Sequence, residues 1–109
     1  MKIGQIAKMA QQMQAQLAQV QAELHEMTLE GSVGGGAVRV VISGSGELRA
    51  VHIDPAAVDP AEVEMLQDLV LTAVNDAIGR ARTLERERTA ALAGGIGMPN
   101  LGVPSGLRR

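Results

Sequence analysis

The 109-residue sequence contains no phenylalanine, tyrosine, tryptophan or cysteine. Any core must therefore use aliphatic side chains and methionine, and the base-stacking platforms of the usual single-strand and RNA readers are missing. Without cysteine, disulfides and thiolate metal sites are excluded, which fits a cytoplasmic protein. Lys2 and Lys8 interrupt the apolar residues at the N-terminus, so we expect neither a signal peptide nor a membrane span.

The length is that of one domain, and we assign it to residues 1–93. From residue 94 the composition changes, because glycine and proline interrupt every regular element. The residues concerned are Gly94, Gly95, Gly97, Pro99, Gly102, Pro104 and Gly106, and the chain ends in Arg108-Arg109. We expect residues 94–109 to form a flexible tail.

The formal net charge of −2 conceals three blocks of different sign. Residues 1–22 carry two lysines and no acid, residues 23–76 carry ten acids against two arginines, and residues 77–109 carry six arginines against two glutamates. The chain therefore has basic ends and an acidic middle.

The first element that we predict is a helix over residues 3–27. Its apolar residues recur at alternating spacings of three and four, as in a heptad seam. They are Ile3, Ile6, Ala10, Met13, Leu17, Val20, Leu24 and Met27. Such a helix would be about 37 Å long, so part of it must project from a small domain. The seam can pack either on the protein's own second helix or on another chain, and the pattern leaves both alternatives open.

The central stretch, residues 34–54, predicts a β-hairpin that follows a short strand over residues 28–33. Val38, Val40 and Ile42 alternate with other residues, and so do Val51 and Ile53, which is typical of half-buried strands. The turn between them lies at residues 44–47, where two glycines can take positive φ without a Cβ clash and so allow a tight reversal. Three glycines at residues 34–36 predict a turn after the first strand.

A second long helix is predicted to follow Asp59, which would be its N-cap, with Pro60 at the first helical position and Glu62 in the capping-box position. We expect this helix to reach about Leu92. Its apolar face comprises Val63, Leu66, Leu69, Val70, Ala73, Val74, Ala77, Ile78, Ala81 and Leu84. The elements together predict an α+β domain of helix, three strands and helix.

Residues that could carry catalysis or hold a metal have simpler explanations. His25 and His52 have no ligand partners at recognisable spacing. Asp54, Asp59, Glu62 and Glu64 lie beside two prolines and fit turn and helix-cap positions. We therefore predict no metal and no cofactor.

Two further motifs contain residue types that occur in chemical sites. Ser43 and Ser45 lie at a hairpin turn, without an adjacent base or a nucleophile elbow. The three glycines at residues 34–36 precede a strand, whereas a phosphate-binding loop precedes a helix. We predict that the protein is not an enzyme.

Several motifs closely resemble the YbaB/EbfC family of bacterial nucleoid-associated proteins. They are Gly34-Gly35-Gly36-Ala37-Val38-Arg39-Val40, Gly46-Glu47-Leu48-Arg49-Ala50-Val51-His52-Ile53-Asp54-Pro55, Glu64-Met65-Leu66-Gln67-Asp68-Leu69-Val70 and Ala73-Val74-Asn75-Asp76-Ala77. The resemblance implies a helix, three antiparallel strands and a second long helix. It also implies a tweezer-like homodimer whose helices protrude and contact DNA, and no catalytic activity.

A homodimer is also expected on size alone. A three-stranded sheet and two long amphipathic helices cannot bury all their apolar surface within so small a monomer, and large exposed apolar patches are rare on soluble monomers. A symmetric dimer would cover that surface.

The charge blocks suggest where DNA would bind. Because both helices join the sheet at one end, their other ends should lie away from it, and cations there would meet phosphates. The predicted contact residues are Lys2, Lys8, Arg80, Arg82, Arg86 and Arg88. Alternatively, the arginines form a solvated helix face paired with Glu85 and its neighbours. The first helix also carries glutamine where family members commonly carry lysine, which weakens the DNA hypothesis for that helix.

The leading hypothesis is thus a cytoplasmic, nucleoid-associated homodimer. It would bind duplex DNA with little sequence specificity and contribute to nucleoid organisation and gene regulation. The rival is a protein-interaction module whose helices grip a DNA replication or recombination protein and bind DNA weakly or not at all. Neither hypothesis involves a membrane or a small-molecule substrate.

Overall fold

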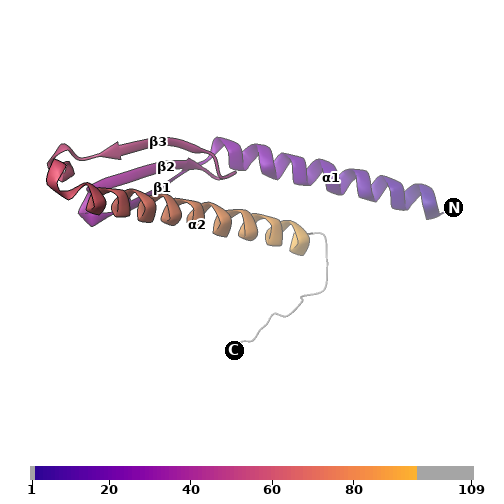
Figure 1. The fold of residues 1–109 in the computed structure, drawn as a ribbon. Coiled ribbons are helices and arrows are strands. Elements are labelled where there is room, and N and C mark those ends of the chain that lie inside the picture. Colours follow the sequence, from indigo (N-terminus) through magenta and orange to yellow (C-terminus); the bar gives the residue numbers. More distant parts are fainter. Residues whose placement is uncertain (1, 96–109) are drawn as a thin grey trace, which may run out of the picture.

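The computed structural model describes residues 2–95. These residues form, in order, α1 (Lys2–Glu26), β1 (Thr28–Val33), β2 (Val38–Ser43), β3 (Leu48–Ile53) and α2 (Val63–Gly95). Short 3₁₀ turns at Gly34–Gly36, Pro55–Ala57 and Pro60–Glu62 connect them (Figure 1). The predicted fold class and element order are therefore confirmed. No helix within residues 2–95 has both the length and the apolar character needed to cross a membrane.

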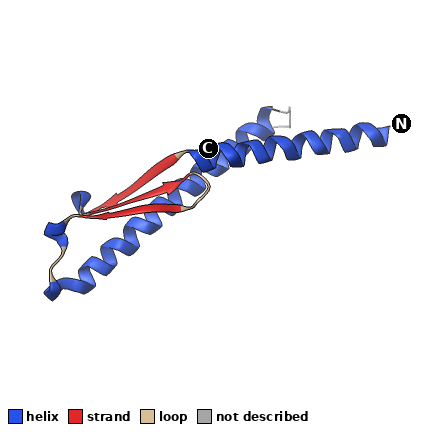
Figure 2. Cartoon of the chain, turned by 90° about the horizontal axis from the view of Figure 1, so that it is seen from above, coloured by secondary structure: helices blue, strands red, loops and turns tan. Residues whose placement is uncertain are grey.

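The three strands form one antiparallel sheet in the order β1-β2-β3, and α2 packs across β1 and β2 on one face (Figure 2). Val38, Val40 and Ile42 of β2 are fully buried under this helix, which contributes three buried alanines to the same core. The alanines are Ala73, Ala77 and Ala81. Because their side chains are small, helix and sheet can approach closely.

Gly31 of β1 shows how close that approach is. A Cβ atom on Gly31 would lie 2.8 Å from the Ala73 carbonyl oxygen and 2.8 Å from the Ala77 amide nitrogen. Real Cβ atoms essentially never come so near to backbone atoms. A glycine is therefore required here by contact between two main chains, although its φ is ordinary.

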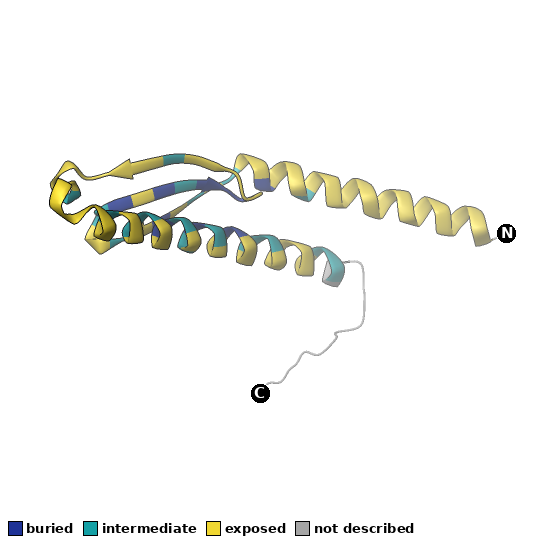
Figure 3. Cartoon of the chain, viewed as in Figure 1, coloured by how far each residue is buried: buried dark blue, intermediate teal, exposed yellow. Residues whose placement is uncertain are grey.

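Helix α1 projects from the sheet, and almost all of its surface is exposed (Figure 3). Its single buried residue is Leu24, whereas Ile3 is 80% exposed and Leu17 39% exposed. The radius of gyration is 19.8 Å, against about 13 Å for a compact domain of 100 residues. The seam of α1 therefore does not pack on α2 along most of its length, which excludes the intramolecular alternative for that part. Packing of the seam on another chain stays a prediction.

The glycine turns were only partly predicted. Gly34, Gly35 and Gly36 all have positive φ and form the expected turn between strands. In the β2–β3 turn, however, only Gly46 has positive φ. Gly44 is needed for a different reason, because a Cβ there would lie 2.7 Å from the Leu24 carbonyl oxygen. Of the two glycines that can take positive φ in this turn, only Gly46 therefore does so.

The ends of α2 also differ from the prediction. The Asp59 carboxylate accepts a hydrogen bond from the Ala61 amide at 3.0 Å, as an N-cap does. It caps the 3₁₀ turn at Pro60–Glu62, so Pro60 opens that turn and the α-helix begins at Val63. At the other end α2 continues to Gly95, beyond the predicted end at Leu92. Residues 96–109, most of the predicted tail, lie outside the described residues.

Strand β3 is less buried than its alternation suggested. The pairing register places Ile53 opposite Val38, Val51 opposite Val40, and Leu48 opposite Ile42, so all three share the helix-facing side of the sheet. They are nevertheless 39%, 47% and 46% exposed respectively. The expectation of half-burial fails within one chain because α2 lies over β1 and β2 and stops short of β3.

Candidate nucleic-acid interface

The base of α1 is held by the β2–β3 turn. Arg49 Nη2 donates a hydrogen bond to the His25 carbonyl oxygen at 2.8 Å, and Arg49 Nε donates to Glu47 Oε1 at 3.0 Å. His25 Nδ1 and Ser45 Oγ are hydrogen-bonded at 3.3 Å. We call this arrangement the clasp and define it as His25, Gly44, Ser45, Glu47 and Arg49. It fixes the direction in which α1 leaves the sheet.

Close backbone contact reinforces the clasp. The Gly44 amide donates to the Met27 carbonyl oxygen at 3.0 Å, and the absence of a side chain at Gly44 leaves room for the last turn of α1. Leu24, which is fully buried, anchors that turn against the sheet. Ser43 Oγ, 2.8 Å from Ser45 Oγ, also accepts a hydrogen bond from the Glu47 amide at 3.0 Å. The serines thus serve the turn.

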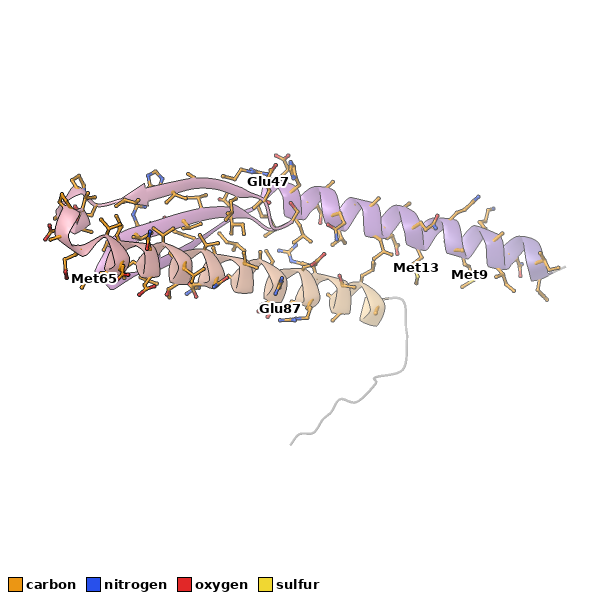
Figure 4. The ribbon with its side chains drawn as sticks, viewed as in Figure 1. Met9, Met13, Glu47, Met65 and Glu87 are labelled. Atoms are coloured by element: carbon orange, nitrogen blue, oxygen red, sulfur yellow. The ribbon has the colours of Figure 1, made fainter. Side chains whose placement is uncertain are left out.

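Lys2 and Lys8 lie on the projecting part of α1, and both are exposed. Helix α1 contacts α2 at Gln21, whose Nε2 donates a hydrogen bond to Glu85 Oε2 at 3.0 Å. Lys8 precedes Gln21 by 13 residues. That separation corresponds to about 20 Å along the helix. Met9 and Met13 extend from the same projecting part into solvent (Figure 4). The structure thus separates the two lysines from the arginines.

Arg80 and Arg86 line an open groove between β1 and α2, and both are exposed. Arg80 Nε donates to Asp76 Oδ2 at 3.1 Å within the same helix. The groove is also lined by Glu30 and Glu87, the latter labelled on α2 in Figure 4. These two arginines therefore lie among carboxylates, where an exposed ion pair contributes little stability.

Arg82 lies on a different side of α2. It lines a hollow beside the β2–β3 turn, together with Ser45 and Glu85. Arg88 is exposed and follows Ala81 by seven residues, so it shares the core-facing side of α2 beyond the sheet. Arg80 and Arg82 flank the buried Ala81, so they lie at the end of the sheet. The prediction had required them to lie beyond it, at the distal end of the helix.

Half of the carboxylates of residues 23–76 lie at the opposite end of the molecule. Asp54, Asp59, Glu62, Glu64 and Asp68 lie on the connection from β3 to α2 and on the first turns of α2. Figure 1 shows this connection at one extreme of the long axis and the start of α1 at the other. Five of the ten carboxylates of residues 23–76 therefore lie at one end of the monomer, and the other five lie on α1, on β1, in the β2–β3 turn and in the middle of α2.

Within residues 2–95, no group of three or more histidine, aspartate or glutamate side chains is placed to hold a metal ion. His25 belongs to the clasp. His52 lies on β3 with its side chain on the sheet face away from α2, opposite Arg39.

Nothing in the sequence pattern marks Arg49 as a residue that joins the sheet to α1. In the charge pattern it is one of two arginines among the ten acids of residues 23–76, whereas in the structure its guanidinium hydrogen-bonds the last turn of α1 and Glu47. The close approach that requires Gly44 was equally hidden, because both partners are backbone atoms from segments about 20 residues apart. Only a three-dimensional structure brings these atoms together.

The profile of the YbaB/EbfC DNA-binding family matches residues 1–96. The chain belongs to this family. A nucleoid-associated protein of Saccharopolyspora erythraea is 51% identical over 104 residues, covering 92% of this chain and 90% of the relative. A nucleoid-associated protein of Nocardia farcinica is 50% identical over 97 residues, covering 89% of this chain and 88% of the relative. The resemblance inferred from the motifs is confirmed.

The fold matches a solved structure as well. The crystal structure of an uncharacterised protein from Helicobacter pylori superposes with a TM-score of 0.72, at 24% sequence identity, covering 89% of this chain and 99% of that chain. At this identity the match establishes a shared fold and nothing about binding. This family is a DNA-binding family and not one of enzymes.

Proposed function

We propose that this protein binds duplex DNA as a homodimer with little sequence specificity, and so contributes to nucleoid organisation and gene regulation. The observation that carries the proposal is membership of a DNA-binding family over residues 1–96, with relatives about half identical that are named nucleoid-associated proteins. The proposal locates the protein on the nucleoid in the bacterial cytoplasm. It assigns no catalytic activity, cofactor or small-molecule substrate.

The proposed contacts are with phosphate groups. All six predicted contact residues, Lys2, Lys8, Arg80, Arg82, Arg86 and Arg88, are exposed. Cations on exposed helices neutralise phosphates and release counterions, which gives binding that depends on salt more than on sequence. The sequence has no aromatic side chain to stack on unpaired bases, so duplex is the form of DNA that fits.

The acidic end of the monomer favours DNA binding at the other end. Carboxylates on the β3–α2 connection and the first turns of α2 are accompanied by no lysine or arginine and would repel a phosphate backbone, whereas α1 and the last turns of α2 carry the candidate cations together with carboxylates. DNA is therefore expected at the end from which α1 projects. In a homodimer, two such ends would double the number of phosphates that one particle contacts.

Apolar surface supports the homodimer. The buried hydrophobic core of the described chain consists of seven residues, three of which are alanine. Large aliphatic side chains remain exposed on α1, β3 and α2, which is unusual for a soluble monomer. Association of two copies would remove part of this surface from water.

Mobility shifts of unrelated duplexes over a salt series test DNA binding. We expect binding at low salt that weakens as salt rises, with similar affinity for all sequences. Arg82→Ala combined with Arg86→Ala should weaken binding and lower the salt slope by about 2 per subunit. Arg39→Ala, which removes an exposed arginine of the sheet paired with Glu30, serves as the matched control and should leave binding unchanged. No binding at low salt, or an unaltered double variant, would refute the proposal.

The rival function, gripping a DNA replication or recombination protein, is favoured by one observation. Four of the six candidate cations, Arg80, Arg82, Arg86 and Arg88, are interleaved with carboxylates, and Arg80 is already paired with Asp76. This helix could therefore present a mixed-charge surface to a protein. One stoichiometric partner recovered after nuclease treatment, together with no mobility shift at low salt, would favour this rival.

A further inference from the structure

Strand β1 is an edge strand of the sheet, and within residues 2–95 no other strand pairs with its outer side (Figure 1). The Gly44 amide donates to the Met27 carbonyl oxygen in register with the β1–β2 ladder. Hydrogen-bonded pairs alternate along an antiparallel ladder, so residues 29, 31 and 33 are the ones that bond β2. The backbone groups of the other three residues of β1 therefore point away from the sheet.

These three residues are Thr28, Glu30 and Ser32, and each has one N–H and one C=O group at the open edge. No other backbone group of the described chain bonds them. Their side chains lie on the sheet face away from α2, because Gly31 between them faces that helix. A row of such unpaired groups is a template for pairing with another extended chain.

An open groove runs between this edge and α2, and its volume is about 670 Å³. Sites that bind ligands commonly measure about 300 to 1,000 Å³. Strand β1 contributes Leu29 and Glu30 to the lining, and α2 contributes side chains between residues 75 and 87. Among these are Thr83 and Leu84, so one wall of the groove combines polar and aliphatic groups.

Gly79 of α2 also lines the groove. A Cβ atom there would meet no atom of the described chain within 4 Å. Glycine disfavours the interior of a helix, and no contact within the described residues requires it at this position. At Gly31 the missing side chain allows two main chains to approach closely. The open space at Gly79 would allow the same approach to a chain that enters the groove.

We propose that this groove binds an extended segment of another protein, which adds to the sheet as a fourth strand beside β1. Its backbone pairs with the outward groups of Thr28, Glu30 and Ser32, as in domains that bind peptides by strand addition. Every second side chain of the segment faces α2 and fills the space at Gly79. This inference goes beyond the proposed function and does not depend on DNA binding.

The lining defines the chemistry of the segment. Its side chains that face α2 lie near Leu29 and Leu84, so aliphatic residues fit there. The alternate side chains lie beside Glu30, where a lysine or arginine would form a cross-strand pair of opposite charge. Carboxylates also outnumber guanidinium groups three to two in the lining, which favours a basic partner. The expected segment thus alternates basic and aliphatic residues.

A second copy of this chain fits the edge less well than a separate peptide. Antiparallel pairing of two β1 edges about a two-fold axis would place both α2 helices on the same face of the joined sheet, next to each other. The flanks that meet would carry Asp76, Arg80 and Glu87 from each copy. Burying these charges between two helices costs desolvation energy, whereas a single strand leaves them hydrated at the rim.

The test uses the peptide acetyl-Lys-Val-Lys-Val-Lys-Val-amide, titrated into the isotope-labelled full chain and followed by NMR. We expect a dissociation constant below about 1 mM, with shifted amide resonances at Thr28, Glu30 and Ser32. Exchange of these three amides should slow at least about fivefold at saturating peptide, because they become hydrogen-bonded. The same peptide N-methylated at every residue should not bind. A peptide with glutamate in place of lysine should bind at least about threefold more weakly.

Two substitutions in the full chain locate the site. Ser32→Pro removes one outward N–H and leaves the bonds to β2 in place, as edge strands tolerate, so the dissociation constant should rise about fivefold. Ser32→Thr keeps that N–H and should bind as the wild type does. Gly79→Leu fills the groove and should weaken binding about tenfold. Thr72→Leu, at an exposed position of α2 outside the groove, is its control.

Circular dichroism verifies that each variant folds. The proposal is overturned if the lysine peptide causes no shifts at millimolar concentration, or if Ser32→Pro and Gly79→Leu both bind it unchanged. It is also overturned if a DNA duplex, and not the peptide, shifts the three edge amides. Shifts of these amides that depend on protein concentration alone would assign the edge to a second copy of the chain and would equally refute a peptide site.

Discussion

Helices α1 and α2 both carry regular apolar stripes, yet only α2 packs against the sheet. Helix α2 buries three alanines over β2, whereas the 25 residues of α1 include one buried side chain, Leu24. The difference shows that a stripe determines which side of a helix is apolar but not what that side meets. The helix that docks closely is the one with small residues at the contact, namely the three buried alanines of α2, which face Gly31 on β1.

The two helices are consequently held by different means. Helix α2 is supported along several turns by contact with the sheet, and α1 is held at its last turn by Leu24 and the clasp. We therefore expect substitutions under α2 to affect the whole fold, and substitutions in the clasp to affect mainly α1. All unfolding measurements below compare variants at one protein concentration, because association contributes to stability.

The largest effect should come from Gly31→Val. Its branched side chain would overlap the backbone of α2 at Ala73 and Ala77, so sheet and helix must separate. We expect a loss of about 3 kcal/mol in the free energy of unfolding, measured with urea. Gly79→Ala, on α2 with no atom within 4 Å of the added Cβ, is the control and should not destabilise. A loss below about 1 kcal/mol for Gly31→Val would contradict the close packing.

Leu24→Ala should come next, with a loss of about 2 to 3 kcal/mol, because it removes the one fully buried side chain of α1 and leaves a cavity. Leu17→Ala, seven residues earlier in the same seam and 39% exposed, should cost less than about 1 kcal/mol. Urea unfolding gives both values. Equal losses would mean that the seam is held along its length, contrary to the contrast between the helices.

Arg49→Met should have a smaller, local effect of about 1 kcal/mol, since it removes the hydrogen bonds to His25 and Glu47 but keeps an apolar stem. Hydrogen exchange should quicken in the last turn of α1 and stay unchanged in α2. Arg39→Met, which breaks an exposed pair with Glu30, should change stability by less than about 0.5 kcal/mol. Quickened exchange throughout α2 would show that the clasp supports the whole fold.

The smallest effect should be a gain. Gly4 lies within α1, and a Cβ there would meet no atom within 4 Å. Gly4→Ala should therefore increase local helix stability by about 0.5 to 1 kcal/mol, since alanine loses less backbone entropy than glycine. Hydrogen exchange near residue 4 should slow. A decrease in helicity would indicate that α1 bends or packs at this point.

The sequence sufficed for the element order and for most boundaries, because its patterns are strong and local. Thr28–Val33 and Val38–Ser43 begin and end where alternation predicted. The start of α2 was harder, since Asp59 and Pro60 open a 3₁₀ turn with the same capping chemistry as an α-helix. The end was missed because Gly94 and Gly95 continue a helix that their composition disfavours.

For the candidate interface, the sequence identified the cations but not the carboxylates that lie beside them in the fold. Exposure of all six followed from their positions on helix surfaces. The groove that places Arg80 beside Glu30 depends on contact between β1 and α2, which no local pattern encodes. Likewise, the exposure of Val51 could not be predicted. Alternation shows which face of a strand is apolar, but not which strands of the sheet the helix covers.

The clasp has a further consequence that follows from length. Helix α1 extends about 37 Å from its base, so a tilt of roughly 5° there would displace its tip by about 3 Å, the length of one hydrogen bond. Any tilt of α1 thus takes place at the clasp, and Lys2 lies near the end of the helix that such a tilt displaces most. Atoms of Gly44 and Arg49 therefore govern which phosphate a distant lysine can reach under the proposed binding mode.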